Sequence, residues 1–195
     1  MSRSAERNRR ADARRNYSAI LDAAIQLLDA QPDASLDAIA TAARLTRQTV
    51  YAHFPSREHL MAAVVDRITD EAVAAMDAAE PDSGSAADAL IRVLGAGAQI
   101  ARRYPVLAQQ IASLPVSPHV DEERHAPVAD RINRVIQRGQ ASGEFDDQLP
   151  AEWLAAITIK IGHAVGEEVD AGRMSRAEAA NALRTVLFRV LRSGV

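Results

Sequence analysis

The sequence contains no cysteine, and aromatic residues make up only 4% of its 195 positions. Without thiols the chain can form neither disulfides nor thiolate metal sites, and it has no cysteine nucleophile. The chain is long enough to bury a substantial core without such cross-links. A reducing compartment fits this composition, and we expect the protein to be cytoplasmic.

Long apolar runs are missing as well. No stretch approaches the roughly 20 consecutive apolar residues that a transmembrane helix needs. The first fifteen residues are charged and lack the apolar segment of a signal peptide. We therefore expect no membrane partner.

Sequence motifs of the common enzyme classes are also absent. The chain has no phosphate-binding loop, no GxGxxG followed by a helix, no HExxH and no GxSxG. We expect no enzymatic activity, no cofactor and no bound metal. His163 stands one helical turn before Glu167, a spacing that a metal pair can use, but a hydrogen-bonded or exposed histidine is the commoner arrangement.

The net charge of −3 gives no indication of a nucleic-acid partner, whereas the distribution of charge does. Residues 1–15 carry six arginines against two acidic side chains, a net charge of +4, and residues 61–195 carry a net charge of −5. A positive end joined to an acidic body is expected when one end meets phosphate. A solvated, disordered tail is an equally good interpretation of residues 1–15.

The alanine-rich composition and the lack of alternating β-branched runs predict an all-α protein of about nine helices. Ser35 and Thr46 are the predicted N-caps of two short helices. The expected helices lie at 9–30, in two turns after Ser35, and at 47–54, 56–79, 87–103, 105–114, 128–141, 150–171 and 176–192.

Two short helices that follow a longer one form the helix-turn-helix plan, in which the second short helix enters the major groove of DNA. Apolar or small residues must then stand where the helices cross. These are Ile39, Ala40, Ala43, Leu45 and Val50, with Phe54 also facing inward. On the exposed side, Arg47 suits guanine and Gln48 suits adenine, so both are candidates for base readout.

Residues 17–60 resemble the DNA-binding domain of the tetracycline-repressor-like (TetR) family. Ile-Ala at 39–40, Thr-Val-Tyr-x-His-Phe at 49–54 and Ser-Arg-Glu-x-Leu at 56–60 occur together and in order. One such string would be weak support, but the ordered set is specific. A helical crossing without a nucleic-acid partner is the alternative interpretation of this segment.

The resemblance implies that Thr49, Tyr51 and His53 lie against the operator backbone or its adjoining bases. Arg57 holds the position that the family usually gives to a lysine near the start of the fourth helix, where a cation can meet a phosphate. The complete expected DNA-binding set is Ser35, Thr46, Arg47, Gln48, Thr49, Tyr51, His53 and Arg57.

Two positions depart from the family pattern. Arg44 replaces the glycine that is common in the turn, so the turn is either less tight or holds a strained left-handed conformation. Gln48 stands where a small residue is frequent, which would alter how closely the helix approaches the DNA backbone.

For the C-terminal half, the resemblance implies a ligand cavity and a dimer built from the last two helices. We thus expect a basic arm at 1–15, a helix-turn-helix domain at 16–60, and a ligand-binding and dimerisation domain at 61–195, joined by the long helix at 56–79. The expected dimer or inner-core residues are Trp153, Ile157, Ile161, Gly162, Gly166, Leu183, Leu187 and Val190. The candidate pocket residues are Leu94, Ile100, Tyr104, Leu107, Ile111, Ile132, Ile136 and His163.

Together these features predict a ligand-responsive, homodimeric transcriptional regulator, in the simplest form a repressor that an unknown small-molecule effector releases from a palindromic double-stranded DNA operator. The alternative is an α-helical small-molecule-binding or interaction protein that does not bind DNA.

Overall fold

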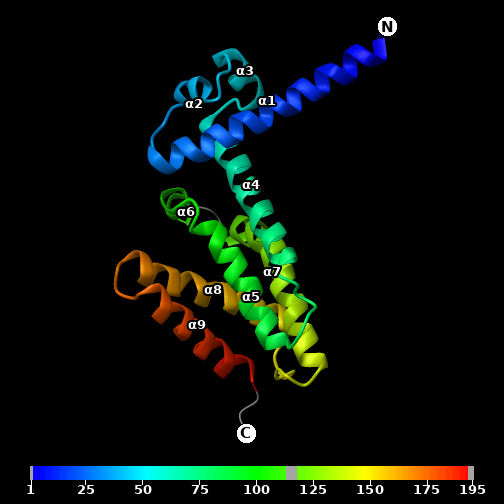
Figure 1. The fold of residues 1–195 in the computed structure, drawn as a ribbon, viewed down its shortest axis with the longest axis vertical. Helices are drawn as coiled ribbons and strands as arrows, with labels where there is room; N and C mark the ends of the chain where they lie inside the picture. The colour runs from blue at the N-terminus through cyan, green and yellow to red at the C-terminus, as the bar shows by residue number, and fades with distance from the viewer. Residues whose placement is uncertain (1, 113–117, 193–195) are drawn as a thin grey trace. The chain divides into compact units, whose positions relative to one another are not determined.

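The computed structural model describes residues 2–112 and 118–192, and over these ranges the chain forms nine α-helices and no strand (Figure 1). The expected all-α fold is confirmed. The helices are α1 (Ser2–Ala30), α2 (Leu36–Ala42), α3 (Arg47–His53), α4 (Arg57–Ala78), α5 (Ala86–Ala101), α6 (Pro105–Ala112), α7 (Pro118–Ala141), α8 (Ala151–Asp170) and α9 (Arg176–Leu191). Within the part of the chain that is described, no helix is long and apolar enough to cross a membrane.

The helices divide into two compact units. The first contains α1 to α3, the part of α4 up to Glu71, and α6. The second contains the rest of α4, most of α5, and α7 to α9. The division therefore falls inside α4, whereas the sequence placed it at residues 60 and 61. Leu60 and Val64 explain the difference, because both are fully buried in the core of the first unit.

The core of the first unit collects apolar side chains from α1 to α4 and from α6. Its buried members include Ile20, Leu28, Leu36, Ile39, Ala40, Val50, Phe54, Leu60, Val64 and Leu107. The inward orientation expected for Ile39, Ala40, Val50 and Phe54 is confirmed. Leu107 was assigned to the C-terminal half from the sequence, but it packs with the helix-turn-helix residues.

The core of the second unit lies among α4, α5 and α7 to α9. Its buried members include Met76, Leu90, Val93, Ile132, Ile136, Leu154, Leu187 and Leu191. Helix α8 packs against both α7 and α9.

The side-chain caps of the two short helices are as predicted. The Ser35 hydroxyl accepts a hydrogen bond from the Ala38 N–H at 3.2 Å, and the Thr46 hydroxyl accepts one from the Thr49 N–H at 3.1 Å. Each bond satisfies a main-chain donor that the first turn of a helix leaves without a partner.

Two helices begin earlier than the sequence suggested. Helix α1 begins at Ser2 rather than near residue 9, so most of the expected basic arm is helical. Its alanine, arginine and glutamate residues are strong helix formers. Helix α7 begins at Pro118 and continues through Pro127, where a helix start had been expected. An internal proline removes one main-chain hydrogen bond, yet the helix continues through this position.

Gly139 in α7 is required by a close approach of Phe145. The ring of Phe145 is buried and lies against Gly139, and a methyl group on residue 139 would overlap it. The Phe145 N–H also donates to the Gly139 carbonyl at 3.0 Å, which fixes the backbone at this point. No larger side chain fits at residue 139 unless the ring moves.

We predict that Gly139→Ala lowers the free energy of unfolding by about 1 to 3 kcal/mol, because overpacking displaces a core ring. Gly95→Ala in α5 is the matched control, because a methyl group there meets open space. It should raise stability by about 0.5 to 1 kcal/mol through helix propensity. Urea unfolding of both variants measures this, and equal shifts would contradict the assigned contact.

Candidate nucleic-acid interface

The turn between α2 and α3 is tight, and Arg44 is its left-handed residue. The Leu45 N–H donates to the Ala40 carbonyl at 2.9 Å, and the Arg44 N–H donates to the Thr41 carbonyl at 3.1 Å. This pair of bonds is the Schellman motif that ends many helices, and its left-handed position usually belongs to glycine. Arg44 has a φ of +56°. The sequence allowed either a looser turn or a strained left-handed residue 44, and the structure has the strained left-handed residue.

Helix α3 directs polar side chains outward and apolar side chains inward. Val50 is completely buried, while Arg47 and Gln48 are exposed. Tyr51 exposes 44% of its surface, a large fraction for an aromatic residue that could otherwise have joined the core. Thr49 is half-buried. The outward side of α3 therefore offers hydrogen-bonding groups that the fold of the first unit does not use for packing.

Arg47 forms an ion pair with Asp37 in the first turn of α2. No sequence pattern indicates this pair, which links the two short helices. Asp37 is well placed for a negative charge because the helix dipole favours anions in the first turn. An exposed ion pair contributes little to stability, so Arg47 can exchange Asp37 for another acceptor at small cost.

Thr46 and Thr49 interact through their hydroxyl groups, whose oxygens lie 2.8 Å apart. Since Thr46 also caps α3 and Ser35 caps α2, all three side chains serve the local fold. The contact of these three side chains with DNA stays a prediction. Such a contact would have to use the hydroxyl donor or lone pair that the hydrogen bonds described here do not occupy.

The Arg57 guanidinium is directed toward the turn that joins α1 to α2. It donates to the carbonyls of Ala34 and Pro32, each at 2.5 Å. Arg57 thereby ties the start of α4 to a segment more than twenty residues earlier. Two of its five donors are used in this way. The expected phosphate contact stays a prediction and depends on the remaining donors.

Glu58, beside Arg57 in the first turn of α4, adds a negative charge. A hydrogen bond with the Ser56 side chain, aided by the main-chain N–H of Glu58, holds the pKa of this carboxyl below its usual value. Glu58 is therefore ionised at neutral pH. Its charge partly offsets the cation that the resemblance places next to a phosphate.

Tyr17 of α1 lies at the surface of α3. It was not among the residues predicted for the site. Its ring centre lies 5.1 Å from that of Phe54 and 6.1 Å from that of His53. Tyr17 is 40% exposed, and His53 is half-buried. No sequence signal distinguishes Tyr17 from an ordinary core aromatic, because its exposure depends on how α1 crosses α3.

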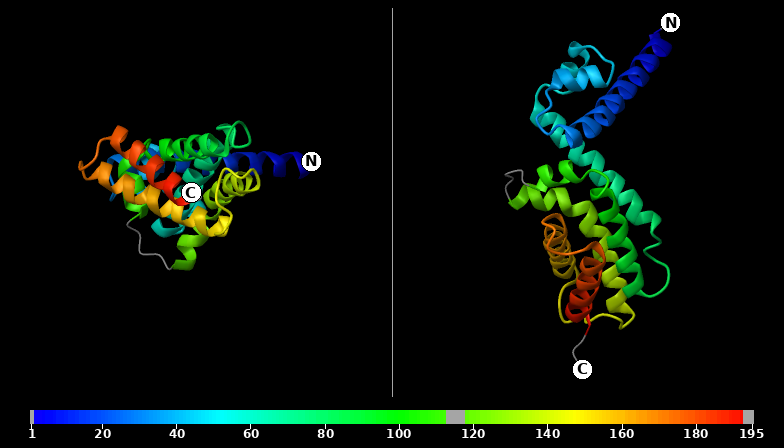
Figure 2. Two further views of the ribbon diagram at one scale, coloured as in Figure 1. Left: turned by 90° about the horizontal axis from the view of Figure 1, so that it is seen from below. Right: turned by 60° about the vertical axis from the view of Figure 1, so that its left-hand side comes forward.

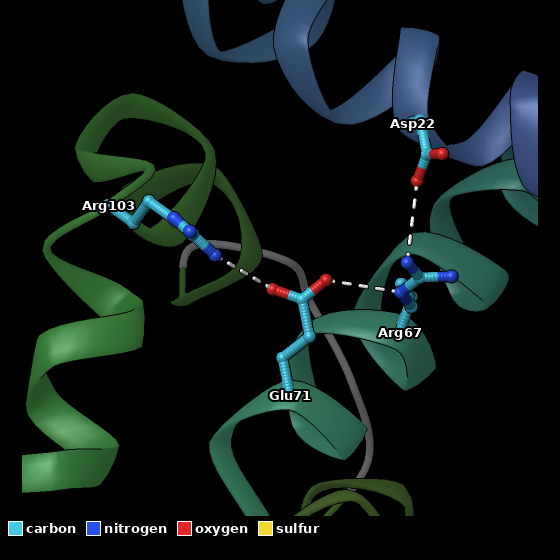
Figure 3. A network of polar contacts seen from close by, with 4 residues as sticks. All are labelled: Asp22, Arg67, Glu71 and Arg103. Atoms are coloured by element: carbon cyan, nitrogen blue, oxygen red, sulfur yellow. Dashed lines mark hydrogen bonds and ion pairs between the residues drawn. The ribbon is translucent and has the colours of Figure 1, made fainter. Parts of the chain in front are cut away.

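A chain of polar contacts links α1, α4 and the segment before α6 within the first unit (Figure 3). Arg67 contacts Asp22 at 3.4 Å and Glu71 at 3.1 Å, and Glu71 also contacts Arg103 at 3.5 Å. In Figure 3, Glu71 stands between the two arginines. The segment leading into α6 is thus attached to the same unit that carries α3.

The candidate pocket residues are divided between the two units. Ile100, Tyr104, Leu107 and Ile111 belong to the first unit, and Leu94, Ile132, Ile136 and His163 belong to the second. Leu107, Ile132 and Ile136 are fully buried core residues. His163 lies with its ring centre 5.2 Å from that of His125 in α7. A pocket lined by these residues stays a prediction.

The dimer candidates on α8 and α9 differ in exposure. Trp153 is 51% exposed, and Val190 is exposed as well. Leu187 is completely enclosed in the core of its own unit and cannot touch a partner. Val186, which the sequence analysis did not name, is exposed beside it. The remaining candidates, Ile157, Ile161, Gly162, Gly166 and Leu183, are half-buried.

Comparisons with known proteins find similarity between part of the first unit and a described family. Residues 20–64 match the family model "Bacterial regulatory proteins, tetR family". The HTH-type transcriptional repressor LfrR of Mycolicibacterium smegmatis is 41% identical over 80 residues. This match covers 41% of the present chain and 42% of LfrR, so it spans less than half of that relative.

Solved structures resemble the chain over most of its length. LfrR from Mycobacterium smegmatis in complex with proflavine has a TM-score of 0.61 at 27% identity, covering 89% of this chain and 94% of that one. A TetR family transcription regulator from Marinobacter aquaeolei VT8 has a TM-score of 0.69 at 17% identity, covering 96% and 100%. At the latter identity the likeness shows the fold alone.

We predict that Arg44→Gly raises the free energy of unfolding by about 1 kcal/mol, because glycine adopts the left-handed conformation without a steric penalty. Arg44→Ala is the control, since it removes the same charge but keeps a β-carbon at a φ of +56°. It should leave stability close to that of the wild type. Thermal unfolding of the wild type and the two variants measures these differences. Equal stability of the glycine and alanine variants would contradict backbone strain at Arg44.

Proposed function

This chain belongs to the TetR family of bacterial regulatory proteins, and we propose that it is a DNA-binding transcriptional regulator of the cytoplasm. The proposal is a homodimeric repressor that leaves a palindromic operator when a small-molecule effector binds. The observation that carries it is the exposed polar side of α3 above the buried Val50 and Phe54. No catalytic step is part of this function.

In this proposal α3 enters the major groove and reads bases with the side chains at its N-terminal end. The Arg47 guanidinium can donate two bonds to guanine, and the Gln48 amide can pair with adenine. Arg47 would exchange Asp37 for the base, which the exposure of the ion pair supports. Each such contact discriminates between bases by about 1 to 3 kcal/mol.

The effector half of the proposal rests on the relative LfrR, whose structure was solved in complex with proflavine. A ligand changes operator affinity only if it binds better to a conformation that fits the operator less well. Helix α4 runs through both units, so we assign it the transmission of that change. Of the candidate pocket residues in the second unit, we propose Leu94 and His163, which are not fully buried, as effector contacts.

The rival is an α-helical interaction protein that does not bind DNA, and a gel shift separates the two. The full chain should retard duplex DNA from its own upstream region, with an affinity that falls steeply as salt rises. Absence of binding at every salt concentration would favour the rival.

We predict that Tyr51→Ala and Arg47→Ala each weaken operator binding, by about 1 to 3 kcal/mol for Arg47. Both side chains are exposed, so the melting temperature should stay near that of the wild type. Arg176→Ala, which removes an exposed cation from α9 in the second unit, is the control and should bind normally. Unfolded Tyr51 or Arg47 variants, or wild-type affinity in both, would contradict the assigned role of α3.

The proposed dimer uses the exposed apolar side chains of α8 and α9. Trp153, Val186 and Val190 lie on the surface of the second unit, where apolar groups commonly mark an interface. A methyl group built on Gly162 or Gly166 would meet no atom of the described residues within 4 Å, so a partner's backbone can approach α8 closely there. Leu187 is left out of this surface because it is buried.

We predict that Trp153→Glu shifts the protein from dimer to monomer at micromolar concentration without unfolding it, because a charge on the apolar surface opposes its burial. Equilibrium sedimentation measures the change. Gln99→Glu, at an exposed position of α5, should remain dimeric. A monomeric wild type, or a Trp153 variant that dimerises normally, would contradict the proposed interface.

A further inference from the structure

The N-terminal turns of α1 form an exposed helix that does not contribute to the core. Among the α1 residues whose side chains are described, Ile20 is the first that is fully buried. The described side chains before Tyr17 are exposed, apart from two that are half-buried. Figure 1 and the right-hand view of Figure 2 show these turns projecting beyond α2 and α3 within the first unit. Within the first unit, the exposed described side chains of these turns are available to another molecule.

The arginines of this projecting segment are concentrated on one side of α1. A helix turns by about 100° per residue, so Arg14, Arg10 and Arg7, which lie three, seven and ten positions before Tyr17, share its side. Arg15 points to the opposite side and pairs there with Asp12. Among the described side chains, this basic side contains Arg7, Arg10 and Arg14, while Arg9 lies on the other flank of Tyr17. Arg10 is paired with an acid, since Glu6 contacts it at 2.7 Å.

Tyr17 fixes the direction in which this basic side points. Its ring contacts Phe54 and His53 at the C-terminal end of α3, so α3 lies on the same side of α1 as the arginines. Toward the N-terminus from Tyr17, the same side of α1 extends past the end of α3. There it presents arginine side chains. A molecule that lies along the outward side of α3 and continues past it would meet Arg14, then Arg10, then Arg7.

Building on the proposed function, we propose that this segment of α1 is a preformed arm whose Arg7, Arg10 and Arg14 bind phosphates of duplex DNA next to the bases read by α3. The guanidinium group matches phosphate through two parallel hydrogen bonds. The fifteen residues from Ser2 to Asn16 extend about 22 Å as a helix. That length corresponds to about six base pairs.

A membrane surface fits this helix less well than DNA does. An amphipathic helix that binds lipid needs a side rich in large apolar residues. Between residues 2 and 16 the apolar residues are all alanines, at positions 5, 11 and 13. The arm has cations to bind phosphate but no apolar side to insert into lipid.

Because phosphate contacts carry no sequence information, the arm adds affinity without changing which bases are preferred. It also lengthens the stretch of DNA that the protein needs for full affinity. Each phosphate contact adds about 0.9 to the slope of log affinity against log salt.

The test uses the full chain and two duplexes from its own upstream region. One is the shortest duplex that the wild type retards in a gel, and the other has about ten further base pairs on each side, more than the reach of the arm. The proteins are the wild type, the triple variant Arg7→Gln, Arg10→Gln and Arg14→Gln, and the single variants Arg14→Gln and Arg15→Gln. Circular dichroism checks that each remains helical.

The wild type should bind the long duplex about tenfold more tightly than the short one, and the triple variant should lose this gain and part of the salt slope. Arg14→Gln should weaken binding to the long duplex more than Arg15→Gln, although both remove one exposed cation from the same helix. Equal losses of affinity in the two single variants would contradict the proposed contact of the arm with DNA. Equal affinity of the wild type for the short and the long duplex would also contradict it. If no protein binds either duplex, the result would instead contradict the proposed function itself, and with it the role of the arm in DNA binding.

Discussion

The arrangement of the candidate interface depends on the burial of Ile39, Val50 and Phe54 in the core of the first unit. Helices α2 and α3 have seven residues each, too few to be stable in isolation. Packing on α1 and α4 holds them in place, and the same packing decides which side of α3 remains outside. Because the apolar side chains point inward, the polar side chains between them lie on the outside, where they meet solvent, neighbouring polar groups such as Asp37, or a partner.

Local rules made the helix-turn-helix predictable from the sequence. A cap such as Ser35 or Thr46 acts on a donor only three residues away, so the sequence contains both partners. The inward positions of Val50 and Phe54 follow from helical periodicity in the same way. Arg44 was harder, because a tight strained turn and a looser turn are both compatible with arginine there. The Schellman bonds of residues 44 and 45 distinguish the two possibilities.

Contacts between distant parts of the chain could not be predicted. The bonds from Arg57 to the α1–α2 turn, and the packing of Leu107 with the helix-turn-helix core, depend on the tertiary fold. Periodicity shows that side chains share one side of a helix, but not whether that side faces the core or the solvent. For this reason Leu187 and Trp153 looked alike in the sequence, although one is enclosed and the other exposed.

In the proposed complex, two copies of α3 present their outward side chains to successive major grooves. Protection of guanine N7 atoms from dimethyl sulfate tests it most directly, because these atoms lie in the major groove. We expect two protected segments on one face of the upstream duplex, centred about 34 to 36 Å apart or at a multiple of that spacing. Protein bound to the duplex with no N7 protection, or with a single protected segment, would contradict it.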